Sequence, residues 1–580
     1  STLLLCLLLS PGQSKTLPSG TFSVPLDARG VHTLFWRLDY DDRTVSMELH
    51  SKVPAGSWLA LGFSDYGDIT NADLCFFWTD WRGKTHLEDT WTAENGKLYR
   101  DIHQDCHDWG WDRVGGVTKL VFSRKFDTCD DYDYVIEEGT THVVWATGPG
   151  PLFHLQRLDM TSMDHGFQRT QLLKNLASVV QLASDVWSLT VTEDNNRVLG
   201  RETTYWCKVV KLDQRLSKKH HILKFEPVIT AGNEPLVHHM ELFHCEGPAD
   251  QQLPLYRGPC DSEDRPDDIK VCKKVLAAWA MGATPFYYPQ EAGLPVGGAD
   301  YNLYAMLEVH YNNPELREDW VDSSGMRVYM SPTLRKHDAG VMELGLEYID
   351  KMAIPPGQPH FPLSGYCISE CTGVSLPPEG ITVFGSQLHT HLTGIQVMTR
   401  HIRDGREIPE LNRDNHYSTH FQEIRLLKRA VKVLPGDALI TTCTYNTTGR
   451  PNITLGGFAI TDEMCVNYIY YYPKTELEVC KSAISDQSLQ TYFRQVHEWE
   501  RQSTSPRLGI SDNYKAIDWN PVRASVLHEL YIQSPIYMQC NQSNGERFPG
   551  DWTSVPVTPV LYPLPPAPRI CEQHSEQYYT

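Results

Sequence analysis

Two adjacent histidines, His238 and His239 in PLVHHMELFHC, are the first residues of this sequence whose type suggests metal chemistry. The apolar residues around them predict a β-strand, and neighbouring side chains of a strand point to opposite faces. The two imidazoles can therefore share one metal only if the strand is bulged or if they coordinate through different ring nitrogens. A second pair, His220 and His221 in SKKHHILKF, shows that the dipeptide alone proves little, and we interpret that pair as surface or structural residues.

Another histidine pair has a spacing that suits chelation. His389 and His391 lie two residues apart in SQLHTHLTG, so a strand would place both imidazoles on one face while Thr390 points away. Gly394 follows closely and predicts a turn, so the pair would lie near a strand end that can open to solvent. The alternative is two exposed polar residues on a half-buried strand. His310, in YAMLEVHYNNP, is a lone histidine at a predicted strand end, and on its own it indicates an ordinary core or surface residue.

Met464, in TDEMCVNY, is an ordinary core residue unless it faces the pair His389 and His391. Two imidazoles and a thioether suit a soft, redox-active ion, which favours copper cycling through Cu(I) over zinc or magnesium. Three imidazoles from His238, His239 and His310 would also bind Cu(I) or Cu(II). The spacing alone does not establish that these distant residues converge. The sequence has no HExxH, GxSxG or P-loop motif that would indicate a rival chemistry.

The elements that must position these residues are mostly strands. Residues 18–150 predict a β-sandwich, because runs such as HTLFWRLDY and TVSMELH alternate apolar and polar side chains between turn clusters. We interpret residues 151–189, which begin as a Pro-rich and Gly-rich stretch and continue as a polar one, as a linker. Residues 190–475 again predict strands broken by Pro and Gly, whereas helices are expected only in residues 476–580.

The last region is helical and ends in a proline-rich tail. In SDQSLQTYFRQVHEWE the apolar residues recur on one helical face, at Leu489, Phe493, Val496 and Trp499. In NPVRASVLHELY, Asn520 can cap a second helix whose first turn accepts Pro521. The tail TSVPVTPVLYPLPPAPRI predicts an extended chain, and Cys571 directly after it indicates that the tail is pinned.

Composition indicates the secretory pathway and excludes nucleic acid as a partner. The net charge of −20, from 52 basic and 72 acidic side chains in 580 residues, repels polyphosphate. The 15 cysteines never form CxxC and favour disulfides, of which seven can form if Cys6 leaves with the leader. Residues 1–17 contain STLLLCLLLS, a signal-like segment too short to span a bilayer, so a membrane tether would require an uncleaved leader. The sequons at Asn446, Asn452 and Asn541 fit a glycosylated product.

These motifs resemble those of the copper type II, ascorbate-dependent monooxygenases. HHMELFHC and QLHTHLTG are similar to the two signatures of that family, and LEVHYNNP and DEMC occur in the expected order between and after them. The similarity extends through ETTYWC, VLAAWAMGA, DAGVMELGLEY and LPGDALITTCTYNT, from about residue 20 to 545. The leading domain, with SDYGD, NADL and DTCDDYDY, looks like that of the phenylethylamine-hydroxylating branch, whereas the peptidylglycine-hydroxylating branch lacks such a domain.

The resemblance implies a mainly β fold and a set of cofactors. The N-terminal part would be a DOMON-type β-sandwich, followed by two jelly-roll-like copper subdomains over residues 190–355 and 356–475 and by the helical C-terminal region. Two copper ions per chain and ascorbate as the reductant are implied. The ligands of the electron-supplying copper would be His238, His239 and His310. The ligands of the oxygen-activating copper would be His389, His391 and Met464.

The resemblance further implies an activity, namely hydroxylation of the benzylic β-carbon of a phenylethylamine with O₂ and ascorbate, in a secretory vesicle lumen or as a secreted protein. Tyramine is slightly favoured over dopamine, because IHQDCHDW, with its Cys106, looks like the invertebrate branch. Glu308, two positions before His310 and on the same strand face, is a candidate to bind the substrate amine. Two alternatives stay open: an orphan monooxygenase of this family with another substrate, and a secreted, non-catalytic copper-binding protein.

The family pattern also implies a disulfide framework. It pairs Cys207 with Cys260, Cys245 with Cys272, Cys367 with Cys480, Cys371 with Cys540, Cys443 with Cys465, and Cys129 with Cys571. Cys75 and Cys106 remain, and we predict that they bond to each other.

Two further expectations concern subunits and a cation. Vertebrate members carry a closely spaced cysteine pair that links subunits, whereas ERQSTSPRLG in this chain has none, so we expect a noncovalent homodimer through the C-terminal helices. In the N-terminal domain, Asp65, Asp68 and Asp73 are candidates for a small cation site resembling one suspected in the family. Solvated turn acids explain these three residues at least as well.

Overall fold

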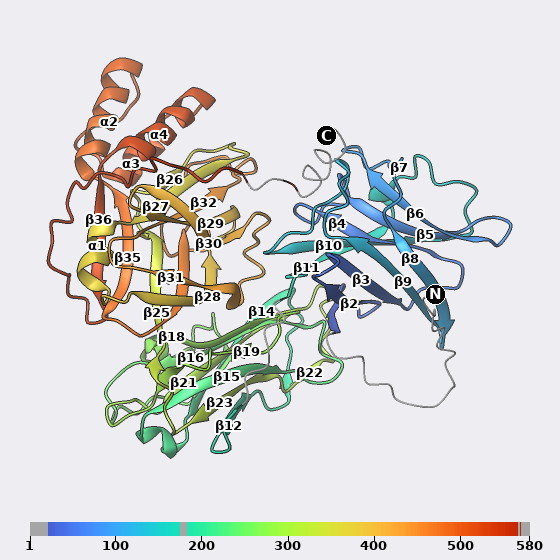
Figure 1. Cartoon of the computed structure of the whole chain (residues 1–580), viewed down its shortest axis with the longest axis horizontal. Coiled ribbons are helices and arrows are strands. Elements are labelled where there is room, and N and C mark those ends of the chain that lie inside the picture. Colours follow the sequence, from blue (N-terminus) through green and yellow to red (C-terminus); the bar gives the residue numbers. More distant parts are fainter. Residues whose placement is uncertain (1–20, 175–181, 567–568, 570–580) are drawn as a thin grey trace, which may run out of the picture.

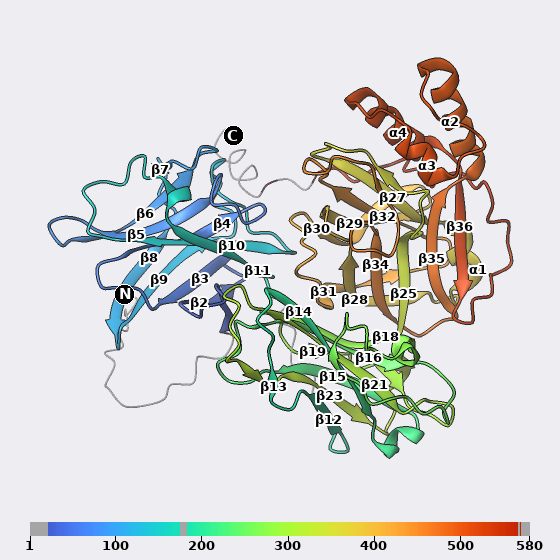
Figure 2. The same ribbon diagram turned by 180° about the vertical axis from the view of Figure 1, so that it is seen from behind.

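The computed structural model describes residues 21–174, 182–566 and 569. They form three β-rich bodies, which Figure 1 shows in blue, green and yellow to red, and Figure 2 from behind. We call them the N-terminal domain, the middle subdomain (residues 187–338) and the C-terminal subdomain (residues 340–542). The expected fold class is confirmed, because strands dominate all three bodies and the longer helices lie near the C-terminus. The predicted leader, residues 1–17, lies outside the described residues.

The N-terminal domain is a sandwich because alternate apolar side chains of its two sheets meet in one core. Leu34 and Trp36 from one sheet and Leu61 and Phe63 from the other are buried there. The first sheet has the order β1-β2-β3-β9-β8, with β1 Phe22–Pro25, β2 His32–Asp39, β3 Thr44–Ser51, β9 Val117–Lys125 and β8 His107–Val114. The second has the order β11-β10-β4-β5-β6-β7, with β11 Asp164–Thr170, β10 Thr141–Gly148, β4 Trp58–Ser64, β5 Asp73–Thr79, β6 Thr85–Thr92 and β7 Leu98–Arg100.

The prediction of a linker over residues 151–189 is wrong for its central part. A short 3-10 turn, Met160–Ser162, leads into β11, which pairs with β10 along its whole length and becomes the edge strand of the second sheet. The sequence of β11, DHGFQRT, has few apolar residues, because this edge faces the neighbouring subdomain with polar side chains. Gln168, for example, donates from its amide to the Sδ of Met281 at 3.1 Å.

The middle subdomain contains two main sheets. The first has the order β12-β23-β15-β20-β24, with β19 also beside β15; the strands are β12 Trp187–Thr192, β23 Gly325–Ser331, β15 His220–Val228, β20 Ala292–Val296, β24 His337–Asp338 and β19 Phe286–Tyr287. The second has the order β17-β14-β21-β16-β18, with β17 Arg257–Pro259, β14 Thr203–Lys211, β21 Tyr304–Asn312, β16 Val237–Cys245 and β18 Cys272–Ala280. Smaller elements are the pair β13 Asn196–Arg197 and β22 Val321–Asp322, and the 3-10 turns Gln214–Ser217 and Asp267–Val271.

The C-terminal subdomain also has two main sheets. The larger has the order β31-β28-β34-β25-β35-β36, with β31 Arg425–Val433, β28 Ile381–His389, β34 Val466–Tyr472, β25 Gly340–Leu346, β35 Leu477–Ile484 and β36 Ile536–Gln542. The smaller has the order β27-β32-β29-β30, with β27 Phe361–Cys367, β32 Ala438–Tyr445, β29 Gly394–Arg403 and β30 Arg406–Asp414. A short pair joins β26 Ala353–Ile354 to β33 Thr454–Leu455.

Two predicted boundaries of this subdomain are wrong. The sequence placed residues 340–346 in the preceding subdomain, but β25 pairs with β34 and with β35 inside the larger C-terminal sheet. Residues 476–580 were expected to be helical, yet β35 and β36 continue the same sheet. Strand pairing between segments far apart in the chain leaves no local pattern, so alternation alone could not assign these strands to a sheet.

The α-helices of the described chain are α1 Ser369–Ser375, α2 Asp486–Glu500, α3 Ile510–Lys515 and α4 Pro521–Gln533. The Ser485 side chain caps α2, and Asn520 caps α4 by accepting from the Arg523 N–H, with Pro521 in the first turn as predicted. The apolar face of α2 buries Leu489, Tyr492, Phe493 and Val496. Trp499, predicted on that face, is instead 72% exposed at the last turn.

Six disulfides bond among the described residues, each in a pairing expected from the sequence. They are Cys75–Cys106, Cys207–Cys260, Cys245–Cys272, Cys367–Cys480, Cys371–Cys540 and Cys443–Cys465. The bond of Cys443 to Cys465 fixes the residue that follows Met464. The seventh expected pair, Cys129 with Cys571, is not tested because Cys571 lies outside the described residues.

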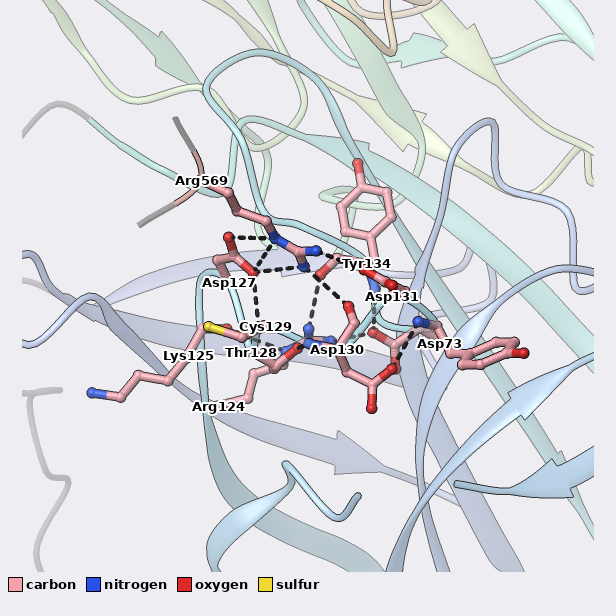
Figure 3. Close-up of polar contacts among 11 residues, drawn as sticks. Asp73, Arg124, Lys125, Asp127, Thr128, Cys129, Asp130, Asp131, Tyr134 and Arg569 are labelled. Carbon is pink, nitrogen blue, oxygen red and sulfur yellow. Dashed lines mark hydrogen bonds and ion pairs between the residues drawn. The ribbon is translucent and has the colours of Figure 1, made fainter. Parts of the chain in front are cut away.

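The C-terminal tail crosses from the C-terminal subdomain to the N-terminal domain. Tyr562 forms a parallel β-bridge with Arg406, the first residue of β30. Figure 3 shows the Arg569 guanidinium directed into the loop after β9, where it lies 2.9 Å from Asp127 and 3.0 Å from Asp131. It also donates to the backbone carbonyl of Asp130 at 3.0 Å. The tail is therefore held on the N-terminal domain by charge-assisted hydrogen bonds.

Candidate metal sites

β16 is bulged where its two adjacent histidines lie. Its pairing with β21 shifts between Val237 and His239, and the carbonyl of His238 accepts from the N–H of Met281 at 2.8 Å. A bulge redirects side chains that a regular strand would send to opposite faces. The Nδ1 atoms of His238 and His239 accordingly lie 3.2 Å apart, and the Nδ1 of His310 lies 3.1 Å from that of His239.

These three imidazoles, which we call the histidine trio, fit a single metal ion. Two nitrogens bound at about 2 Å to one ion with tetrahedral angles are separated by a little over 3 Å, which matches the spacing of the Nδ1 atoms. Burial lowers the pKa of His239 to about 3 and of His310 to about 2, so both are neutral, as metal ligands must be. The ring of Tyr205 stacks on His310 at 4.5 Å and fixes its orientation.

The second pair of histidines lies at the end of β28. The strand ends at His389, and His391 follows just beyond it, with the ring centroids 5.3 Å apart. The Nδ1 of His389 donates to the Gln422 side-chain oxygen at 2.5 Å, and the Nδ1 of His391 donates to the carbonyl of Asp462 at 3.0 Å. Each ring therefore keeps its Nε2 for another partner, an arrangement typical of metal-binding imidazoles. Burial lowers the pKa of His389 to about 4.

The backbone around Met464 is tied to the same pair. The carboxylate of Glu463 accepts from the N–H of His391 at 2.9 Å and from the N–H of Met464 at 3.2 Å. The hydroxyl of Tyr445 donates to the carbonyl of Met464 at 2.7 Å. Met464 is 8% exposed, and the thioether is a soft donor that would favour Cu(I) in such a set.

Acidic and polar side chains lie next to the histidines on both β16 and β28. Glu241 lies two residues after His239 on β16 and pairs with Glu308 of β21. Gln387 lies two residues before His389 on β28 and pairs with Tyr468 of β34. Burial, and next Glu308, raise the pKa of Glu241 to about 8, while a hydrogen bond from Gln387 lowers it. The sheets of the two subdomains therefore face each other at this point.

Glu241 and its strand partner Glu308 have no ion pair among the described residues, whereas Glu343 nearby has one. Glu343 of β25 lies 2.6 Å from the ammonium of Lys481 and accepts from the hydroxyl of Tyr348 at 2.9 Å. Glu308, the amine-binding candidate from the sequence, lies over the bonded Cys207, and burial raises its pKa. Glu241 lies within the motif HHMELFHC, but sequence reasoning assigned no role to it or to Gln422; only their positions in the folded sheets reveal them.

One segment of the C-terminal subdomain, residues 414–425, reaches both histidine clusters, and we call it the bridging segment. Its Gln422 holds His389, and the ring of its His420 lies 6.3 Å from that of His238. The segment is anchored on the N-terminal domain by the buried Asp414, which accepts from the Thr140 hydroxyl at 2.7 Å and from Arg425 at 2.8 Å.

The aspartates of the N-terminal domain do not assemble as suggested, whereas the pair His220 and His221 agrees with its expected role. Asp73 pairs with the buried Arg124 at 2.5 Å, and Asp65 lies 3.8 Å from His416, so the expected cation ligands Asp65, Asp68 and Asp73 do not converge. His221 is fully buried and bonds Asp338 at 2.8 Å, which agrees with a structural role for that pair.

Comparisons with known proteins match each body separately. Residues 189–318 match the N-terminal domain, and residues 337–493 the C-terminal domain, of copper type II ascorbate-dependent monooxygenases. Residues 28–148 match the DOMON domain.

Full-length relatives are similar over most of the chain. The dopamine beta-hydroxylase of Equus caballus is 45% identical over 571 residues, which cover 97% of this chain and 93% of the relative. That of Homo sapiens is 45% identical, covering 94% and 88%. The tyramine beta-hydroxylase of Caenorhabditis briggsae is 40% identical, covering 89% and 87%.

Proposed function

The chain belongs to the copper type II, ascorbate-dependent monooxygenases, and we propose that it hydroxylates the benzylic β-carbon of a phenylethylamine. As a member of that family it is an oxidoreductase with two copper ions and ascorbate as its reductant. The observation that carries the proposal is the unpaired Glu241, which lies between two facing rows of metal-type histidines. A buried carboxylate without a cation is the partner that a substrate ammonium needs.

The three Nδ1 atoms of the trio would hold one copper. The Nε2 atoms of His389 and His391 and the sulfur of Met464 would hold the other. When bound, copper supplies one-electron redox chemistry and the activation of O₂. The protein holds the ligands in place: Gln422 and the carbonyl of Asp462 fix the ring orientations and tautomers of the second pair.

Glu241 orients the substrate by accepting from its ammonium. Because strand residues advance about 3.3 Å each, its Cα lies about 7 Å along β16 from that of His239. Gln387 and Tyr468 of the facing sheet are its polar neighbours, so the amine would be held between the two subdomains. Glu308 is the second candidate for this contact, because it pairs with Glu241 across the strands.

Tyramine is the slightly favoured substrate, and dopamine the second. Relatives named for either substrate lie at 40–45% identity, so the preference rests on Cys106, which bonds Cys75. The test is turnover with copper and ascorbate on tyramine, dopamine and a glycine-extended peptide. β-Hydroxylation of an amine supports the proposal. Hydroxylation of the peptide alone, or of none of the three, would contradict it.

A noncovalent homodimer through the C-terminal helices is also proposed. Apolar side chains are exposed on α2 and α4, at Trp499 (72%), Val522 (71%), Val526 (45%) and Ile532 (45%). Such side chains gain from burial against a second copy. Sedimentation of the wild type and of a Trp499→Ser, Val522→Ser variant tests this, because only the variant should sediment as a monomer.

We place the protein in a secretory vesicle lumen or outside the cell. Asn446 and Asn452 are exposed, so they can carry glycans, whereas Asn541 is half-buried and less accessible. Within the described residues, no helix combines the length and apolarity required to cross a membrane. Treatment of the expressed protein with a glycosidase, followed by mass measurement, tests which asparagines are modified.

A further inference from the structure

Arg169 of β11 is a half-buried arginine without a counterion among the described residues. Its Nε is buried and has no hydrogen-bond partner, and its guanidinium lies over the ring of Phe167 at 4.7 Å. Burial lowers its pKa to about 10, and no carboxylate opposes that shift. A buried unpaired cation destabilises a fold unless an anion binds to it.

The strand places this cation where three bodies meet. Gln168 contacts Met281, whose N–H donates to the carbonyl of His238, so β11 runs beside the trio. Neighbouring residues of a strand face opposite sides, so Arg169 points away from that contact. It shares its face with His142, its partner in β10.

That face is turned toward the bridging segment. The ring of Tyr66 lies 6.2 Å from His142 and 6.0 Å from His416, which belongs to the segment. Four residues further, His420 is exposed, and among the described residues its ring nitrogens have no hydrogen-bond partner. The ring of His420 lies 6.3 Å from that of His238, and the positive charge of Arg169 lowers the pKa of His420, so Arg169 is within electrostatic reach of this pair of rings.

The chemistry of the family identifies the anion. Its amine substrate is a cation and O₂ is neutral, so ascorbate, a monoanion at neutral pH, is the one anionic reactant. The chain as a whole carries a charge of −20 and repels anions, so this reactant needs a local positive site. We propose that Arg169 and His420 bind the ascorbate monoanion beside the histidine trio.

The N-terminal domain therefore contributes directly to the reaction, by receiving the reductant. Arg169 binds the enolate oxygen and the neighbouring hydroxyl oxygen with its forked donors, and His420 contributes a further donor from the C-terminal subdomain. One ascorbate monoanion gives one electron, which reduces Cu(II) to Cu(I), and releases one proton to solvent, which leaves the ascorbyl radical anion. This inference rests on the proposed role of the trio as copper ligands.

The test is anaerobic reduction of the full-length, Cu(II)-loaded protein without amine, followed by loss of the Cu(II) electron paramagnetic resonance signal. Ascorbate is compared with hydroquinone, a neutral reductant. We expect Arg169→Gln to slow reduction by ascorbate about tenfold or more, because a charge-assisted contact is lost, and to leave hydroquinone unaffected. Arg169→Lys keeps the charge and should restore most of the rate.

An unchanged ascorbate rate in Arg169→Gln, or an equal loss with both reductants, would overturn the inference. If Arg169→Gln does not fold, His420→Gln decides, because this exposed side chain is replaced without loss of core packing. A selective loss with ascorbate supports the inference and no selective loss overturns it. Failure of the proposed function is separate: the wild type would then bind fewer than two coppers or would not hydroxylate an amine.

Discussion

His420 and His238 belong to different subdomains, yet their ring centroids lie 6.3 Å apart. The contact exists because the bridging segment is held at both ends. Asp414 is anchored to Thr140 of the N-terminal domain, and Gln422 is bonded to His389. One stretch of chain thus connects the N-terminal domain to both histidine clusters. A change in any of its contacts should alter the position of a histidine in one of these clusters.

Loss of the Gln422 side-chain oxygen should weaken copper binding at the second site. Gln422→Leu leaves the Nδ1 of His389 without an acceptor, so the ring is no longer held, and loss of such partners weakens metal binding about 10–100-fold. Gln422→Glu keeps an acceptor and is the matched control. Competition dialysis against a Cu(I) chelator measures the affinity. Equal affinity of the wild type and Gln422→Leu would show that this hydrogen bond does not hold the ligand.

A bound ammonium favours the ionised form of Glu241, so replacement of this carboxyl group should affect the amine and not its neutral analogue. Hydrogen bonds to charged groups contribute about 1.5–3 kcal/mol, so Glu241→Gln should raise the KM for tyramine at least about tenfold. Glu308→Gln is the comparison that separates the two candidate carboxylates. Hydroxylation of 4-propylphenol, which has a methyl group in place of the ammonium, should be unchanged. A similar loss for both compounds would mean that Glu241 supports the fold and does not bind the amine.

The N-terminal domain should lose stability as the pH rises. Burial, and then the neighbouring Asp73 and Asp133, raise the pKa of Asp89 to about 8, against about 3.9 in an unfolded chain. Between these values the folded chain binds more protons than the unfolded chain, so the free energy of unfolding falls with rising pH.

Asp89→Asn removes this proton uptake and should therefore stabilise the protein increasingly between about pH 5 and about pH 8. The measurement is the difference in unfolding temperature between variant and wild type across that range. The buried Asp89 Oδ2 accepts from the N–H of Asp105, a contact that asparagine can keep. A difference in unfolding temperature that is the same at about pH 5 and about pH 8 would refute the raised pKa of Asp89.

Arg569 should protect the tail from proteolysis. Arg569→Gln removes its contacts to Asp127 and Asp131, whereas Arg569→Lys keeps the charge. We expect faster cleavage between residues 556 and 566 in Arg569→Gln under reducing conditions, with a loss of stability below about 1 kcal/mol because the pairs are partly exposed. Limited proteolysis with mass analysis measures this. Identical cleavage in all three proteins would indicate that the tail is held by other contacts.

The sequence predicted the chemistry of the sites better than their surroundings. His389 and His391 were found because their spacing is a local feature, and the bulge that the pair His238 and His239 requires is present in β16. Gln422 and Glu241 were missed because a single Gln or Glu has no pattern; it becomes significant only when the fold brings it beside a histidine.

The fold class was predictable from alternation, but strand membership was not. β25 and β36 join a sheet through partners more than a hundred residues away or across a helical region, and such pairing is specified by packing and not by local sequence. β11 was missed for a different reason. This edge strand carries Gln168 and Arg169, whose polar side chains lie between bodies. The strand therefore lacks the alternation of apolar and polar residues that would predict it.

Copper stoichiometry tests the central claim most directly, namely that the trio and the set His389, His391 and Met464 each hold one copper. The wild type should bind two coppers per chain, and His239→Ala and His391→Ala should each bind one. X-ray absorption should then show a sulfur ligand in His239→Ala and none in His391→Ala. Two coppers retained in either variant, or sulfur ligation that persists in His391→Ala, would contradict the account.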